Sequence, residues 1–141
     1  MKSVLRQIGR IRTPYRKTAV CPRNVDPEGP ECELEIDVKY RDGLTGLAAG
    51  DKILVLYWFD NVDRDTLLLR RPGSERLNGV FALRSPHRPN PIAVAVVDIK
   101  DIVEGSIRVR GMDCLDGTPL LDIKPAIFAH TAGDENENFV G

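Results

Sequence analysis

The chain has 141 residues, of which 42% are hydrophobic and 29% charged, so one globular domain is expected. Its net charge of −1 provides no overall positive field, and contact with RNA would therefore need local basic patches. Because no apolar run has the length of a membrane span and the N-terminus lacks a signal-peptide core, we expect no membrane association and a cytoplasmic location. Three cysteines without CxxC spacing and two histidines predict no metal site.

Short apolar segments separated by turn residues predict strands along the whole chain. Residues 33–40 alternate charged and apolar side chains, which predicts a half-buried strand, and the continuous apolar run 53–59 predicts a strand buried on both faces. The glycine-rich segment between them is expected to hold a turn and one short helical piece, and the charged segment 64–78 a mobile loop. Further strands are predicted at 8–12, 79–84, 92–102, 107–110 and 120–124.

This pattern predicts an all-β fold, a sandwich or a small closed or partly closed barrel of mostly antiparallel short strands with little helix. No glycine-rich dinucleotide fingerprint is present, so the fold is expected to be non-Rossmann. We expect the domain to span residues 1–130, followed by a polar, acidic tail at 131–141.

The segment from Arg84 to Pro91, RSPHRPNP, is the strongest candidate for a functional loop. Its three prolines fix φ and favour extended neighbours, so a helix is excluded. Two arginines, an imidazole, a hydroxyl and an amide on a stiff loop suit a carboxylate or phosphate ligand. A strand connection whose charges merely face water is the alternative.

Three further clusters carry polar groups at strand ends. Asp60 and Asn61 follow the buried run, where a simple turn explains them equally well. Asp113 and Asp116 precede the Gly117 turn and offer carboxylates for hydroxyl or ammonium groups, although Asp116 could serve only the turn. The segments TPYRK at 13–17 and CPRN at 21–24 add basic side chains.

The string GVFALRSPHRPNPI at 79–92, followed by LDGTP at 115–119 and DIKP at 122–125, resembles the TsaA-like (TrmO) family. The pairs at 8–9 and 46–47 and the triplet TPY at 13–15 agree in order and spacing. The resemblance covers nearly the whole chain. It implies a small β-barrel that binds S-adenosylmethionine, is usually a homodimer, and methylates N6 of threonylcarbamoyl-adenosine beside the anticodon of tRNA.

Carried over by motif, the resemblance implies a cofactor site and an RNA surface. The cofactor set is Asp60, Asn61, Arg84, Val94, Arg110, Gly111, Met112, Asp113, Cys114, Leu115 and Asp116, together with the region of 24–26. The RNA-binding set is Arg16, Lys17, Arg23 and Arg88, which would meet the phosphates of the anticodon loop; no DNA partner is expected.

A general base would help, because the acceptor nitrogen is conjugated to a carbonyl and is a poor nucleophile. The hypothesis assigns this role to Asp113 or to His87.

The chain departs from the family pattern at three positions. Ala126 stands where an aromatic is frequent, Ala93 where glycine is frequent, and Asp60 where histidine is frequent. Several bacterial members also carry a further C-terminal domain that this sequence lacks. The alternative function is therefore a non-catalytic barrel that binds or senses S-adenosylmethionine or another small anion. A hydrolase built on His87 is less favoured, because no serine or cysteine nucleophile is positioned for it.

Overall fold

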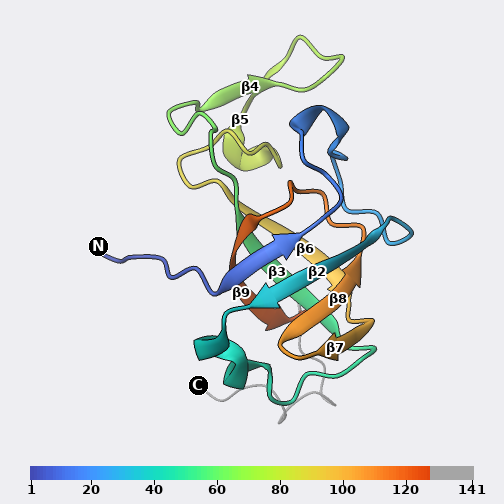
Figure 1. Ribbon diagram of the computed structural model, residues 1–141. Helices are drawn as coiled ribbons and strands as arrows, with labels where there is room; N and C mark the ends of the chain where they lie inside the picture. Colours follow the sequence, from blue (N-terminus) through green and yellow to red (C-terminus); the bar gives the residue numbers. More distant parts are fainter. Residues whose placement is uncertain (128–141) are drawn as a thin grey trace, which may run out of the picture.

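The computed structural model describes residues 1–127, which form β-strands and three short 3-10 helices (Figure 1). The predicted tail at 131–141 lies outside the described residues. The strands are β1 Gly9–Arg12, β2 Glu31–Ile36, β3 Lys52–Trp58, β4 Leu68–Arg70, β5 Leu77–Gly79, β6 Ile92–Asp98, β7 Asp101–Val103, β8 Ser106–Arg110 and β9 Thr118–Pro125. The helices are η1 Thr18–Val20, η2 Val38–Leu44 and η3 Val80–Ala82.

Seven strands form one sheet in the order β6-β3-β9-β1-β2-β8-β7, and every pairing in it is antiparallel. β4 and β5 form a separate hairpin. The expectation of an all-β, mostly antiparallel and non-Rossmann fold is confirmed. No α-helix occurs among residues 1–127, and accordingly none there could cross a membrane.

The two outer strands of the sheet, β6 and β7, are consecutive in the chain. Ile99 donates its N–H to Asp51 O (2.8 Å) and so extends the β3–β6 side, whereas Lys100 donates to Arg108 O (2.8 Å) and extends the β7–β8 side. The sheet must therefore curl until its two edges meet at this turn. No hydrogen-bonded ladder joins the edges, so a fully closed barrel is wrong for the described residues.

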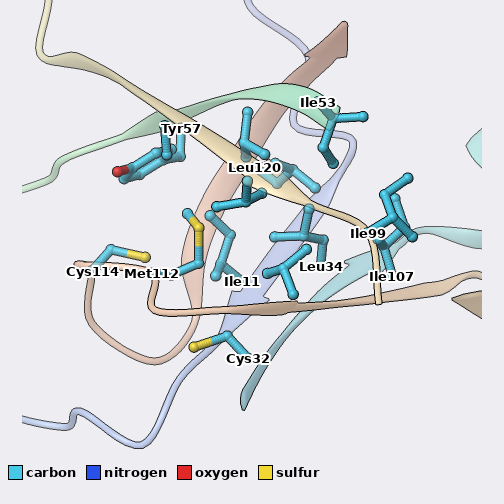
Figure 2. Close-up of a cluster of buried hydrophobic side chains, with 14 of the residues drawn as sticks. Ile11, Cys32, Leu34, Ile53, Tyr57, Ile99, Ile107, Met112, Cys114 and Leu120 are labelled. Carbon is cyan, nitrogen blue, oxygen red and sulfur yellow. The ribbon is translucent and has the colours of Figure 1, made fainter. Parts of the chain in front are cut away.

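The core lies inside the curl, where alternate side chains of the strands converge. Ile11, Leu34, Ile53, Ile107 and Leu120 are fully buried and come from five different strands (Figure 2). Because successive side chains of a strand point to opposite faces, the alternation along β2 and β3 places one set inside and leaves the other nearer to solvent. Met112 and Cys114, from the segment between β8 and β9, complete the core.

Five expectations from the sequence differ from the structure. The alternating strand ends at Ile36, and η2 follows it. β3 alternates between buried and partly exposed residues, so it is not buried on both faces. The single strand predicted at 92–102 is broken into β6 and β7. The predicted strand 79–84 is η3, and the predicted loop 64–78 contains the β4–β5 hairpin.

Candidate functional site

The proline-rich loop is fixed at both ends by hydrogen bonds to the main chain. Arg84 donates from Nη2 to Val94 O (2.9 Å), so the loop entrance is tied to β6. Arg88 donates from Nη1 to Leu83 O (3.0 Å) and Ser85 O (3.2 Å), which closes the loop on itself. At the exit, Phe59 donates its N–H to Pro91 O (3.0 Å). The loop is therefore a rigid platform, as the prolines predict.

A carboxylate and a phenol meet beside this platform. Tyr57 donates its hydroxyl to Asp113 Oδ1 at 2.5 Å, joining β3 to the segment after β8. Burial raises the pKa of the Asp113 carboxyl above its ordinary value, against the hydrogen bond from Tyr57 and the charge of Arg84, which lower it. Burial and the charge of Asp113 raise the pKa of Tyr57 well above its ordinary value, so the phenol remains a donor.

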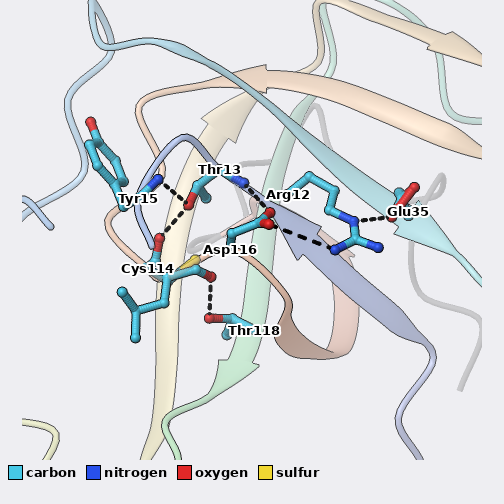
Figure 3. Close-up of polar contacts among 8 residues, drawn as sticks. Arg12, Thr13, Tyr15, Glu35, Cys114, Asp116 and Thr118 are labelled. Carbon is cyan, nitrogen blue, oxygen red and sulfur yellow. Dashed lines mark hydrogen bonds and ion pairs between the residues drawn. The ribbon is translucent and has the colours of Figure 1, made fainter. Parts of the chain in front are cut away.

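The segment that carries Asp113 is held by the chain after β1 (Figure 3). Thr13 donates its hydroxyl to Cys114 O (2.8 Å), and its N–H to Asp116 Oδ1 (3.1 Å). Arg12 lies 3.8 Å from Asp116 Oδ2, and the N–H of Asp116 donates to Tyr15 O (2.7 Å). The Asp116 carboxylate is therefore occupied by contacts that hold the segment in place.

The other members of the predicted cofactor set in this segment offer main-chain groups. Gly111, Met112 and Cys114 are buried, and Leu115 is half-buried.

Arg110 is exposed and lines a cavity of about 290 Å³ between β6 and the 25–27 segment. The other residues around this cavity are Val25, Pro27, Lys52, Val96, Val97, Asp98, Ile99 and Lys100.

The remaining predicted residues lie around the proline loop. Asp60 and Asn61 follow β3 and are exposed, and Asn61 has a φ of 58°. His87 is also exposed, and its Nδ1 accepts the N–H of Asp63 (3.1 Å). No hydrogen bond in the described part of the chain joins His87 to Asp113. The structure thus brings Asp113 together with Arg84 and Val94, and leaves His87 in a separate contact.

The predicted RNA-binding residues divide into two kinds. Arg16, Lys17 and Arg23 are exposed, in the segment around η1. Arg88 is partly buried, and the bonds given above occupy its Nη1 within its own loop. Residues 1–127 contain no group of three histidine, cysteine or acidic side chains that could hold a metal.

Sequence reasoning missed Tyr57 and the bonds that Thr13 makes. A signal for Tyr57 was present, because a phenol at the end of an otherwise apolar strand needs a partner when it is buried. Which group would serve depends on the pairing of β3 with segments distant in the chain, and no local pattern gives this.

Comparison with known proteins places this chain in a family. Residues 10–130 match the family model of the tRNA-methyltransferase O N-terminal domain. A probable S-adenosyl-L-methionine-binding protein of Archaeoglobus fulgidus is 45% identical over 121 residues, which are 86% of this chain and 33% of that protein. The tRNA (adenine(37)-N6)-methyltransferase of Escherichia coli is 33% identical in an alignment of 145 positions, which covers 94% of this chain and 62% of that protein.

A solved structure supports the same assignment. TrmO from P. aeruginosa superimposes with a TM-score of 0.72 and 32% identity, over 90% of this chain and 56% of that one. The chain thus spans from a third to less than two thirds of the length of these three proteins. It belongs to the family of the tRNA-methyltransferase O N-terminal domain.

Proposed function

We propose that this protein transfers a methyl group from S-adenosylmethionine to tRNA, at N6 of threonylcarbamoyl-adenosine beside the anticodon. The observation that carries the proposal is the meeting of Arg84, Val94 and the half-buried Asp113 at one place, from three separate parts of the chain. The relative from Escherichia coli, named as a tRNA (adenine(37)-N6)-methyltransferase, supports the reaction. Residues 1–130 would form the catalytic domain, in the cytoplasm.

The residues present fit S-adenosylmethionine. Its carboxylate suits the Arg84 guanidinium, whose other N–H groups remain available beside the bond to Val94 O. Its ammonium and ribose hydroxyls suit the exposed Asp60 and Asn61 at the end of β3. Main-chain groups of residues 110–115 would border the adenine, and Asp116 would hold that segment through Thr13 and Arg12.

When bound, S-adenosylmethionine supplies a methyl group on a positively charged sulfur, which leaves as a neutral thioether once the acceptor nitrogen takes the methyl. The protein has to align that nitrogen and remove its proton. Asp113 fits the second task, because a raised pKa strengthens a carboxylate as a base. Tyr57 holds one carboxylate oxygen of Asp113, and the other oxygen would take the proton.

RNA would reach this site across the end of the molecule that carries η1 and the proline loop. Arg16, Lys17 and Arg23 are exposed there and would contact phosphates. Arg88 would contribute by holding the loop, with its free N–H groups turned to the RNA backbone. Bases in RNA loops leave their stack at low cost, so the target adenine can enter the site.

We further propose that the protein is a homodimer, formed through the outer strand β6. Among residues 1–127 no strand pairs with its outer edge, whose Val94 O accepts the Arg84 guanidinium, and its Ile92 and Val96 are 39% and 40% exposed. The only charged residue of β6 is Asp98, so two copies can approach there without like-charge repulsion among arginines. Sedimentation should show a dimer for the wild type and a monomer for Ile92→Glu. A wild-type monomer would contradict this arrangement.

Transfer of a labelled methyl group to unfractionated tRNA from a strain lacking the protein tests the proposed function. The wild type should label tRNA. Arg84→Ala should bind S-adenosylmethionine about 10- to 100-fold more weakly, because a charge-assisted hydrogen bond is lost. Arg10→Ala, an exposed arginine on β1, is the matched control and should behave as wild type. Binding of S-adenosylmethionine without any transfer would favour the alternative, a ligand-sensing protein.

A further inference from the structure

Within residues 1–127, the arginines between residues 60 and 90 have no carboxylate partner, although four acidic residues share that stretch. Every ion pair among residues 1–127 involves the main sheet or the segments next to it. The arginines without an ion pair in this stretch are Arg64, Arg70, Arg71, Arg76, Arg84 and Arg88. Six arginines against four acidic residues give this stretch an excess of two positive charges, in a chain whose net charge is −1.

Four of these six arginines lie on one structural unit, which we call the arm: residues 64–82, comprising β4, β5 and η3. Figure 1 shows the arm beyond one end of the main sheet, at the same end as η1. Arg64 anchors its base, because its Nε donates to Pro89 O (2.7 Å) and its guanidinium lies 5.2 Å from the centre of the Trp58 ring.

Main-chain carbonyls orient the arm's guanidinium groups without neutralising them. Arg70 donates from Nε to Glu75 O (3.0 Å), and Arg71 donates from Nη2 to Ala82 O (3.4 Å). A guanidinium has five N–H donors, so each of these side chains retains free donors that can form paired bonds to a phosphate. Arg76 is exposed on the same arm.

An aromatic ring stands next to these charges. Phe81 is 80% exposed in η3, adjacent to the Ala82 carbonyl that accepts from Arg71. An exposed phenylalanine beside arginines is the combination with which proteins bind unpaired RNA, because bases stack on the ring while phosphates meet the cations. A duplex hides its base faces and would gain nothing from the ring.

We propose that the arm binds a single-stranded part of the RNA, with Arg70, Arg71 and Arg76 on phosphates and Phe81 stacked on one unpaired base. This inference rests on the proposed function and extends its RNA surface beyond the predicted residues. Leu67, Leu68 and Leu77 of the arm are also exposed and could contact a second copy of the chain. A symmetric contact would bring two sets of arginines together, so we take RNA as the occupant and a second copy as an outcome of the test.

The test measures the affinity for an anticodon stem-loop RNA at several salt concentrations. In R70Q/R71Q/R76Q the slope of log K against log salt should fall by about 2, at about 0.7 for each lost contact to a single strand. The matched control K2Q/K39Q/K124Q removes three exposed lysines away from the arm and should keep the wild-type slope. Phe81→Ala should bind about tenfold more weakly with an unchanged slope.

Two comparisons separate the outcomes. Phe81→Trp should restore stem-loop binding and Phe81→Leu should not, whereas a fully paired RNA should bind equally to wild type and Phe81→Ala. If the stem-loop binds but arm and control variants have the same slope, the inference is wrong and the proposed function stands. The inference about the arm is also wrong if Phe81→Ala lowers the affinity for RNA only by dissociating a dimer. If the wild type binds no RNA, the inference about the arm and the proposed function both fail.

Discussion

Replacing Asp113 with asparagine is expected to lower kcat about 100-fold or more, because asparagine cannot take the proton of the acceptor nitrogen. The same change should raise thermal stability at neutral pH. Burial raises the pKa of Asp113, which means that the folded protein holds the ionised carboxylate at a cost. Asparagine carries no charge, and its Oδ1 can still accept the hydroxyl of Tyr57.

The stability gain should depend on pH in a defined direction. Below about pH 4, the ordinary carboxyl value, Asp113 is protonated whether the chain is folded or unfolded, so wild type and variant should differ little. As pH rises through the raised pKa of the folded state, the wild type loses stability and the variant does not. The difference in melting temperature should therefore widen over that range and then stay constant.

Two controls identify the role of the carboxylate. Asp116→Asn changes the neighbouring carboxylate, which accepts the N–H of Thr13 and lies near Arg12, so it should lower stability and leave kcat close to wild type. His87→Ala tests the other candidate base, which bonds to the N–H of Asp63. A normal kcat for Asp113→Asn together with a large loss for His87→Ala would assign the base to His87.

Local patterns were sufficient for most of the sheet. Strands such as β2 and β8 were predictable because alternation along a strand reflects which side chains face the core, whereas β3 was recognised by its apolar run of strand length. The break between β6 and β7 was not, since Ile99 is itself fully buried between the charged Asp98 and Lys100, so the alternation continues through the turn. Its cause is the hydrogen bonding of Ile99 to Asp51, which is far away in the chain, and of Lys100 to Arg108.

The hairpin was missed for a different reason. Its charged sequence lacks a buried face, so hydrophobic alternation could not reveal β4 and β5. The site shows the same limit: the sequence singled out Asp113 and Asp116 together, while only the fold shows that Thr13 occupies Asp116 and Tyr57 contacts Asp113. Long-range pairing decides which of two similar carboxylates remains free for chemistry.

The backbone at Gly111 should be the least tolerant point in the candidate cofactor segment. Gly111 has a φ of 75°, its N–H donates to Pro30 O (2.9 Å), and its carbonyl accepts the N–H of Asp26 (2.9 Å). A Cβ at this position would lie 1.5 Å from Asp26 O. The 26–30 segment, part of which lines the cavity beside Arg110, would have to move away.

Gly111→Ala is therefore expected to lower the free energy of unfolding by on the order of 4 kcal/mol, which urea denaturation measures. Gly117→Ala is the matched control, because Gly117 has a φ of 85° and no atom within 4 Å of an added Cβ. That variant should lose only the left-handed backbone cost of about 1–2 kcal/mol. If the two losses are equal, the 26–30 segment moves away from the added Cβ at no cost, and the close approach of Gly111 to Asp26 does not constrain this position.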